Sequence, residues 1–511
     1  MGDSRARALS HRSGSRGAIA VLLTLAACTV GPDYQRPAAP VPARYKEAAA
    51  GWVVAQPVDA TARGAWWSIY NDPVLDGLER RIDISNQNLK AAEAAYRQAE
   101  WLVAQARAGF FPTGTVNASG QRALGSGSSA SGVGGGGGGS GRIVDFFSVS
   151  AAASWTPDLW GQIRRMVESQ VASAQASAGD LANARLSAQG QLATDYLQLR
   201  VADELKRLLD ASAVAFAESL RITRNQYAAG IAAQSDVSQA EAQLQSTQAQ
   251  AIAVGVTRAQ FEHAIAVLIG VPPAELSIAP TDVAAAVPAI PGGVPSALLE
   301  RRPDIAAAER IMAAANAQIG VAEAAFFPTV TLSADAGEAA VALAKLVSAS
   351  GRFWSFGGNV VETVFDAGAR NAAVQQARAV WDQDVADYRQ TVLSAFQQVE
   401  DQFAALRILA QQAVAQDAAV KAAREAERVL NNQYLAGTVA YTSVVVAQQT
   451  ALSDAQTALN IRQSRLVASA ALIEALGGGW NASELPTRAH IDTAAPLDFN
   501  PLPPADAFGR R

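Results

Sequence analysis

The chain has 511 residues, of which 50% are hydrophobic but only 6% aromatic and 17% charged, and its formal net charge is −5. This mildly acidic balance argues against binding of nucleic acid, which requires clustered Lys and Arg. A single cysteine excludes an intrachain disulfide, and the three histidines form no cluster with metal-ligand spacing. Adjacent acids such as Glu400 and Asp401 are typical of a solvated helix face. We therefore expect no enzyme activity, no metal and no cofactor.

The first residues resemble a bacterial lipoprotein signal. Arginines precede the apolar run AIAVLLTLAAC, which ends at Cys28 and is too short to span a bilayer. LAAC resembles a lipobox, in which the cysteine is acylated and becomes the mature N-terminus; the alternative, burial of a lone cysteine, conflicts with its place outside any plausible core. We predict a signal peptide at 1–27, lipid attachment at Cys28 and an N-terminal arm at 28–65. An Asp directly after the acylated cysteine would favour retention in the inner membrane. This chain has Thr29 there, which predicts sorting to the outer membrane.

Proline placement predicts two long helical regions, because proline interrupts helix hydrogen bonding. No proline occurs at 158–271 or at 329–485. Both gaps carry alanine, glutamine and leucine with apolar residues spaced three and four apart, as in RLSAQGQLATDYLQLRVADELKRLLD. An unbroken helix over 161–228 would reach on the order of 100 Å, at about 1.5 Å per residue. That length exceeds the core of a globular domain.

The two helical regions are copies of one unit. NQYAAG at 225–230 recurs as NQYLAG at 432–437, an offset of 207 residues. Gly161 and Gly368 precede the two regions at the same offset. The sequence therefore predicts a tandem repeat, with a first repeat at 66–271, a linker at 272–300, a second repeat at 301–480 and a C-terminal tail at 481–511.

Each repeat also contains FFPT, followed by residues that alternate between apolar and polar, as in TVTLSADA. This period of two predicts strands. Because proline fixes φ and biases the preceding residue towards extended geometry, we expect helix-to-strand junctions at Phe111, Pro112, Phe327 and Pro328. Two strand hairpins are predicted at about 113–157 and 329–365, the first with a mobile glycine-serine connection at 125–141.

These strands have the alternation expected of transmembrane β-strands, with aromatic residues towards their ends. The alternative is a soluble hairpin that caps a helical bundle. A sheet in a membrane must close, since an open edge leaves backbone groups unpaired in hydrocarbon, and four strands cannot close. Eight strands form a cylinder filled by side chains, whereas twelve leave a passage. We therefore expect a homotrimer.

Several motifs together resemble the TolC/OprM outer-membrane efflux channels, and more closely their lipoprotein branch, the NodT family. They are CTVGPDYQRP at the mature N-terminus, WWSIYNDPVLDGLERRIDISNQNL from Trp66, LLERRPDIAAAERIMAAANAQIGVAEAAFFP from Leu298, and the two NQY tips. The resemblance implies an α+β membrane protein that forms a homotrimeric 12-stranded barrel, with four transmembrane strands per chain. Long periplasmic helices would continue the barrel as a tunnel, and the linker, the arm and the tail would supply an equatorial belt.

The resemblance also implies a function: the outer-membrane channel of a tripartite efflux system. Such a channel is a passive exit duct for small molecules or ions, surrounded by outer-membrane lipids and driven by an inner-membrane pump, here of the resistance-nodulation-division type. A periplasmic adaptor protein docks on the helical tips. Two alternatives remain open, namely a channel for type I secretion of peptides or proteins and a non-conducting periplasmic coiled-coil lipoprotein.

The resemblance places a closed gate where the helices meet at the tips. Family members carry acids after the second tip, but the 207-residue offset sets Ser443 opposite Asp236 and Val446 opposite Gln239, so the second repeat lacks them. We expect Asp236, with Glu241, to form a ring that favours cations; the alternative is that Asp236 caps its helix. The candidate gate also includes the glycines that end the helices, Gly230 and Gly437. Three further residues, Tyr227, Tyr434 and Val446, are expected to hold the tip shut by packing.

Overall fold

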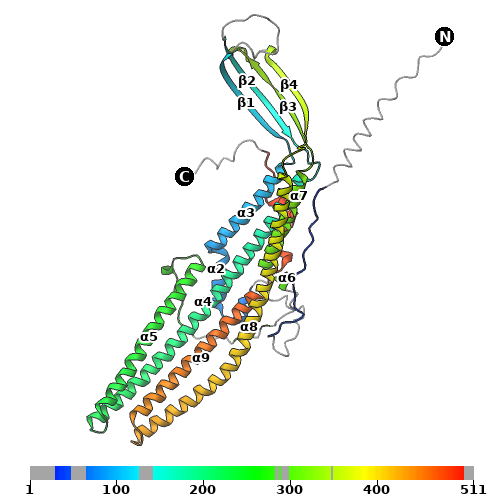
Figure 1. Ribbon diagram of the computed structural model, residues 1–511. Coiled ribbons are helices and arrows are strands. Elements are labelled where there is room, and N and C mark those ends of the chain that lie inside the picture. The colour runs from blue at the N-terminus through cyan, green and yellow to red at the C-terminus, as the bar shows by residue number, and fades with distance from the viewer. Residues whose placement is uncertain are drawn as a thin grey trace, which may run out of the picture.

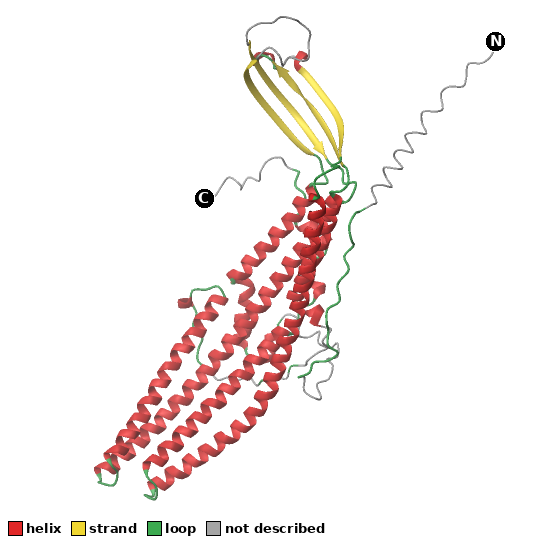
Figure 2. Ribbon diagram, viewed as in Figure 1, coloured by secondary structure: helices red, strands yellow, loops and turns green. Residues whose placement is uncertain are grey.

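The computed structural model describes residues 29–47, 65–125, 142–281, 287–288, 290, 298–346 and 349–499. The molecule is elongated, with a sheet at one end and helices running along the long axis (Figures 1 and 2). The predicted signal peptide, Cys28 and residues 126–141 of the glycine-serine connection lie outside the described residues.

The predicted α+β class is confirmed. The helices are α2 (Pro73–Ser85), α3 (Gln87–Ala108), α4 (Gln162–Ala228), α5 (Gln234–Leu268), α6 (Leu298–Arg301), α7 (Pro303–Ala324), α8 (Ala369–Leu435), α9 (Tyr441–Ala475) and α10 (Arg488–Ala494). The strands are β1 (Thr113–Gly125), β2 (Arg142–Trp155), β3 (Thr329–Ala340) and β4 (Arg352–Val361).

The helices reproduce the tandem repeat. Helices α4 and α8 each contain 67 residues, and α5 and α9 each contain 35. The two longer helices begin after Gly161 and Gly368, whose φ angles of 83° and 90° lie in the left-handed region that favours glycine. At about 1.5 Å per residue each of them is about 100 Å long. Two helical hairpins, α4 with α5 and α8 with α9, therefore lie side by side beneath the sheet (Figure 1).

The sheet is antiparallel, with the strand order β1-β2-β3-β4. Its register places Val116, Ala151, Ala336 and Trp354 in one row across all four strands. Because side chains alternate between faces, this row belongs to a continuous apolar face. The neighbouring row of the opposite face reads Thr115, Ala152, Asp335 and Ser355.

Two ion pairs mark the hairpin ends of the apolar face. Arg122 contacts Asp145 across β1 and β2 at 3.2 Å, and Arg352 contacts Glu338 across β4 and β3 at 3.2 Å. By their register these residues share the face of Val116. Charge therefore interrupts the apolar surface near the end farthest from the helices, and Leu124 and Ile143 lie beyond the Arg122–Asp145 pair on the same face.

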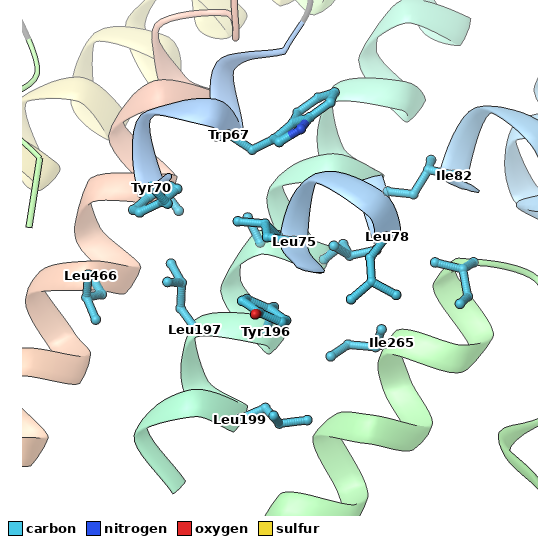
Figure 3. Packing of buried hydrophobic residues seen from close by; sticks show 14 of the residues in the cluster. Trp67, Tyr70, Leu75, Leu78, Ile82, Tyr196, Leu197, Leu199, Ile265 and Leu466 are labelled. Atoms are coloured by element: carbon cyan, nitrogen blue, oxygen red, sulfur yellow. The ribbon is translucent and has the colours of Figure 1, made fainter. Parts of the chain in front are cut away.

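A large apolar cluster lies where α2 packs on the long helices, a region that we call the waist. Helix α2 packs against α4, α5 and α9 there through Leu75, Ile82, Tyr196, Ile265 and Leu466 (Figure 3). Asp72 caps α2 by accepting hydrogen bonds from two backbone N–H groups of its first turn. The same carboxylate accepts a hydrogen bond from the Tyr196 hydroxyl at 2.6 Å, so the cap also fixes α2 to α4.

The tail runs from the waist towards the sheet. Gly478 lies against Trp66 and Leu186 at the waist, whereas Asp492 forms an ion pair with Arg107, in the last turn of α3, at 3.2 Å. Asp492, on α10, therefore lies close to the end of α3 that leads into the sheet.

Glu79, on α2, is fully buried, and neither of its carboxylate oxygens has a hydrogen-bond partner in the described part of the chain. Burial, with smaller contributions from Asp83 and Asp76, raises the pKa of Glu79 to about 9. The side chain is therefore protonated at neutral pH, which avoids the cost of an unpaired buried charge.

This buried acid predicts how stability depends on pH. Between the ordinary pKa of 4.5 and about 9, the folded chain holds a proton at Glu79 that the unfolded chain has released. The contribution of Glu79 to stability should therefore decrease as pH rises through this window, by up to about 1.4 kcal/mol per pH unit.

The substitution Glu79→Gln removes this contribution because glutamine does not ionise. Followed by circular dichroism, the variant should unfold at the parent's temperature at pH 4 and at a higher temperature at pH 8. Glu275→Gln, at an exposed position, is the control and should leave the pH dependence unchanged. Equal unfolding temperatures for Glu79→Gln and the parent at pH 8 would contradict the assignment.

Candidate functional site

The helices enter the sheet through the two Phe-Phe-Pro segments. Phe111 and Pro112 lie between α3 and β1, and Phe327 and Pro328 lie between α7 and β3. The Trp160 ring stacks on Phe327 at 4.9 Å, and its Nε1 donates a hydrogen bond to the Pro328 carbonyl oxygen at 2.7 Å. This contact joins the segment before α4 to the segment before β3, which are far apart in the sequence.

The first phenylalanine of each segment is held differently. Phe110 packs, as does Ile163 of α4, against a buried cluster that contains Val103 and Val167. The Phe110 carbonyl oxygen accepts a hydrogen bond from Trp155 Nε1 at 3.0 Å. Phe326 is 44% exposed and lies under the guanidinium of Arg370, 5.1 Å from the ring centroid. Each junction thus presents aromatic rings and an indole or guanidinium N–H at the border between the sheet and the helices.

The N-terminal arm begins at this junction. Val30 N–H donates to the Trp160 carbonyl oxygen at 3.1 Å. Arg165, which is 4% exposed, donates to the carbonyl oxygens of Val30 and Gly31 and forms an ion pair with Asp33. The residue that follows Cys28 therefore lies where the sheet meets the helices.

From there the arm follows the helices towards the waist. The Tyr34 hydroxyl donates to Glu309 on α7 at 2.6 Å, and Arg36 donates to the Tyr388 hydroxyl on α8 at 3.0 Å. Farther along, the Glu400 carboxylate accepts the backbone N–H groups of residues 46 and 47. The arm thus ties α4, α7 and α8 together along their length.

The opposite end of the molecule holds the candidate gate. Helices α4 and α8 end just before Gly230 and Gly437, whose φ angles are 75° and 74°. The N–H of Ile231 donates to the Gln226 carbonyl oxygen, and the N–H of Thr438 donates to that of Gln433. This is the hydrogen-bond pattern of a helix closed by a left-handed glycine.

The acids of the first tip have partners within the chain. Asp236 is partly buried, and its carboxylate accepts a hydrogen bond from the Ala233 N–H at 3.2 Å at the start of α5. Glu241, one turn farther along, forms an ion pair with Arg224 on α4 at 3.3 Å. Ser443, the counterpart of Asp236, contributes its N–H to the first turn of α9.

The three expected packing residues behave differently. Tyr434 is 9% exposed, lies 5.1 Å from the Tyr441 ring and donates to Thr223 Oγ1 at 3.4 Å. Its counterpart Tyr227 is 47% exposed, and Val446 is 58% exposed. Of these three residues, only Tyr434 is buried within the described chain.

Sequence reasoning missed the contact surface between the two helical hairpins, which we call the intrachain seam. Besides Tyr434 and Thr223, it is linked by hydrogen bonds from Gln448 Nε2 to Ser219 Oγ at 3.1 Å, Gln449 Nε2 to Gln243 Oε1 at 2.8 Å and Gln456 Nε2 to Gln250 Oε1 at 3.2 Å. The many glutamines of these helices were the available signal, but a single sequence does not say which of them face each other.

A second feature of the tip is an open groove of about 450 Å³ between α8 and α9, which we call the tip groove. Its lining is mostly apolar and consists of Ala423, Ala426, Leu430, Thr442, Ser443, Val446, Ala447 and Thr450. Two of the gate candidates of the second repeat, Ser443 and Val446, therefore line a groove that is open in the described chain.

Two other kinds of site are absent from the described residues. Among the described residues, no group of three or more His, Cys, Asp or Glu side chains is placed to hold a metal ion. In the same part of the chain, no helix combines the length and apolar character needed to cross a membrane.

The sequence matches the family of outer membrane efflux proteins over residues 80–271 and 294–478. The probable efflux pump outer membrane protein TtgC of Pseudomonas putida is 30% identical over 461 residues, which cover 89% of this chain and 93% of TtgC. The cation efflux system protein CusC of Escherichia coli is 28% identical over 464 residues, which cover 90% of this chain and 97% of CusC.

Solved structures show the same fold. The outer-membrane channel OprN matches with a TM-score of 0.80 at 30% identity, covering 89% of this chain and 100% of that one. The open state of the MtrE outer membrane channel of Neisseria gonorrhoeae matches with a TM-score of 0.77 at 28% identity, covering 89% and 99%. The fold is thus that of outer membrane channels, and none of these relatives is named as an enzyme. The chain belongs to the outer membrane efflux protein family.

The junction yields a testable prediction about the arm. A Cβ added at Gly161 would lie 2.7 Å from Thr29 Cγ2, whereas one added at Gly368 would meet nothing within 4 Å. Alanine in the left-handed region costs about 1–2 kcal/mol at either position. Gly161→Ala should therefore lower the unfolding temperature more than Gly368→Ala and should make residues 29–33 more sensitive to protease. Equal effects of the two substitutions on both measurements would contradict the contact.

Proposed function

We propose that three copies of this chain form a passive exit duct for small molecules or ions across the outer membrane. One observation carries the proposal: a four-stranded sheet, apolar on one face and unpaired at both edges, continues into two helical hairpins with helices of about 100 Å. The substrate crosses the duct without chemical change, and the chain acts as a channel rather than an enzyme.

The edges of the sheet support the number of copies. In the described chain, β1 pairs only with β2 and β4 only with β3. Pairing β4 of one copy with β1 of the next satisfies these edges, and three copies close a barrel of twelve strands that is wide enough for a passage. The apolar face then meets outer-membrane lipids, and the polar face lines the lumen.

The relatives support the type of cargo and the partners. TtgC is named for an efflux pump and CusC for a cation efflux system, and OpmQ of Pseudomonas aeruginosa, 31% identical, is named for pyoverdine export. These solutes differ so much in chemistry that the duct itself is unselective. We assign energy supply and selection to an inner-membrane pump of the resistance-nodulation-division type, joined to the helical tips by a periplasmic adaptor.

The two alternative functions fit less well. CusC is named for cation efflux and OpmQ for pyoverdine export, which disfavours type I secretion of proteins. A non-conducting coiled-coil lipoprotein would not explain the sheet with its exposed apolar face. On that face Trp354 is 80% exposed and Phe356 is 73% exposed. The channel accounts for both the sheet and the helices.

Single-channel recording in planar bilayers tests the function. Purified protein that migrates as a heat-sensitive trimer on unboiled gels should produce discrete conductance steps. Trimers that insert into the bilayer but never conduct would overturn the channel proposal in favour of a helical spacer.

The same recordings decide the role of Asp236. Its hydrogen bond with Ala233 supports a helix cap, which Asn can maintain because its amide oxygen also accepts. Asp236→Asn should therefore retain the parent's reversal potential in a salt gradient and lose only a small part of the tip's stability, about 0.3–1 kcal/mol from the lost charge at the helix N-terminus. A reduced cation preference in open trimers would instead establish a ring of three carboxylates.

We also propose that Cys28 carries the lipid anchor. Thr29 lies against Gly161, the residue that follows Trp160 at the junction between the sheet and the helices, and this position supports a lipid anchor close to the membrane. Mass spectrometry of the native protein should find acyl groups at residue 28, and Cys28→Ser should abolish them, while the barrel still inserts. An unmodified Cys28 within an uncleaved N-terminus would refute the anchor.

A further inference from the structure

A pocket of about 520 Å³ opens at the waist, and we call it the waist pocket. One side is lined by α4, which contributes Arg185 and Gln189, and by Asp83 of α2. The other side consists of the glycine turn at 477–479 and of tail residues that include Glu484. This volume lies within the range of sites that hold small organic ligands. Every lining residue belongs to one chain, so an inference about the pocket does not depend on the proposed trimer.

The glycine turn and the tail form a fixed wall of the pocket. The turn at 477–479 has φ angles of 94°, 57° and 94°, which lie in the left-handed region that favours glycine. A Cβ added at Gly478 would collide with the Leu186 side chain. Farther along, Gln175 Nε2 on α4 donates a hydrogen bond to the Pro486 carbonyl oxygen at 3.0 Å. The wall is therefore in place before a ligand arrives, which reduces the entropy lost on binding.

Gln189 provides the pocket with an unused hydrogen-bonding group. It is only 6% exposed and lines the pocket, yet its side chain has no hydrogen-bond partner among the described residues. A buried carboxamide without a partner costs free energy, and a ligand can supply the missing bonds. Because the carboxamide offers a donor beside an acceptor, the group that matches it is another amide.

The charges of the lining favour a cation. Arg185 is already paired with Asp83 at 2.9 Å, whereas Glu484 is exposed and forms no ion pair with a described residue. With histidine counted as neutral, the lining therefore has one uncompensated negative charge. Trp480 and Leu186 add an apolar part. The pocket thus suits a ligand with an ammonium group, an amide and an apolar body.

The second repeat shows what covers the same helical face when it is filled. The 207-residue offset relates Arg185 and Gln189 on α4 to Val392 and Phe396 on α8. These two counterparts are 0% and 7% exposed, and the Phe396 ring lies 6.3 Å from the ring of Tyr45 in the N-terminal arm. A peptide segment with an aromatic side chain therefore covers the face in the second repeat. In the first repeat the face is polar and lines the pocket.

We propose that the waist pocket binds a small peptide-like amine. Its amide pairs with the Gln189 carboxamide, its ammonium group lies towards Glu484, and its apolar side chain packs against Trp480. Such a ligand joins α4 to the tail, and because it binds the folded chain it also stabilises the waist. This binding site is additional to the exit duct.

Titration calorimetry of the full-length protein in detergent tests the ligand class. L-phenylalaninamide, which carries all three groups, should bind saturably with one molecule per chain. N-acetyl-L-phenylalaninamide lacks the charge and should bind about two- to fivefold more weakly. Phenethylamine lacks the amide and should bind about tenfold more weakly. Absence of saturable phenylalaninamide binding, or equal affinities for all three compounds, would overturn the proposal.

Gln189→Leu tests the amide contact. The variant should bind phenylalaninamide about tenfold more weakly than the parent but phenethylamine equally well, because only the first compound has an amide to lose. Its unfolding temperature should not fall, since the deleted carboxamide has no partner in the described chain. Gln191→Leu, on the same helix and outside the pocket lining, is the matched control and should bind like the parent. Equal losses for both compounds in Gln189→Leu would contradict the amide contact.

Two further variants test the charge and the location. In Glu484→Gln, phenylalaninamide and its acetylated analogue should bind with the same affinity, because the ammonium group has lost its partner. Ala182→Phe places a ring in the pocket and should abolish binding of all three compounds while the helical circular dichroism spectrum is retained. Undiminished binding by folded Ala182→Phe would place the ligand elsewhere and overturn the site. A preserved preference for the charged compound in Glu484→Gln would overturn the role of Glu484.

Discussion

The backbone groups along the outer edges of β1 and β4 have no strand partner within the described chain, and the rest of the architecture depends on how they are satisfied. Hydrocarbon offers no water to replace a missing strand, so the apolar face can enter a membrane only after the edges are paired with other copies. Pairing of the strands also positions the helices, because each strand hairpin is joined to a helix through a short Phe-Phe-Pro junction. One chain therefore forms one third of the wall of the channel, and the enclosed lumen forms only when three chains assemble.

The two repeats have helices of equal length but strands of different length. Along the helices the offset is 207 residues throughout, and the paired helices have equal lengths of 67 and 35 residues. Helical hairpins that stand side by side need equal lengths, because a mismatch would leave apolar side chains uncovered at one end. The strands differ, with 13 and 14 residues in the first hairpin and 12 and 10 in the second.

Rigidity is concentrated at the junction and the waist. Arg165 and Glu400 bind main-chain groups of the arm, and Asp72 joins a helix cap to Tyr196, so three helices are fixed by charge-assisted hydrogen bonds. These contacts fix the middle of the helices and the end nearest the sheet through residues that are far apart in the sequence.

The sequence by itself determined the long helices, the four strands, the repeat and the family, because proline gaps, periods of 3.6 and two, and the recurrence of NQY and Phe-Phe-Pro are local signals. It also placed Gly230 and Gly437 at the helix ends, since only glycine adopts that backbone without strain. It did not determine that Glu79 is buried without a partner, that the arm lies along α4, α7 and α8, or that Tyr434 is covered while its twin Tyr227 is exposed. Those outcomes depend on which faces meet, and an alanine- and glutamine-rich helix presents nearly the same residues on every side, so only the tertiary structure decided them.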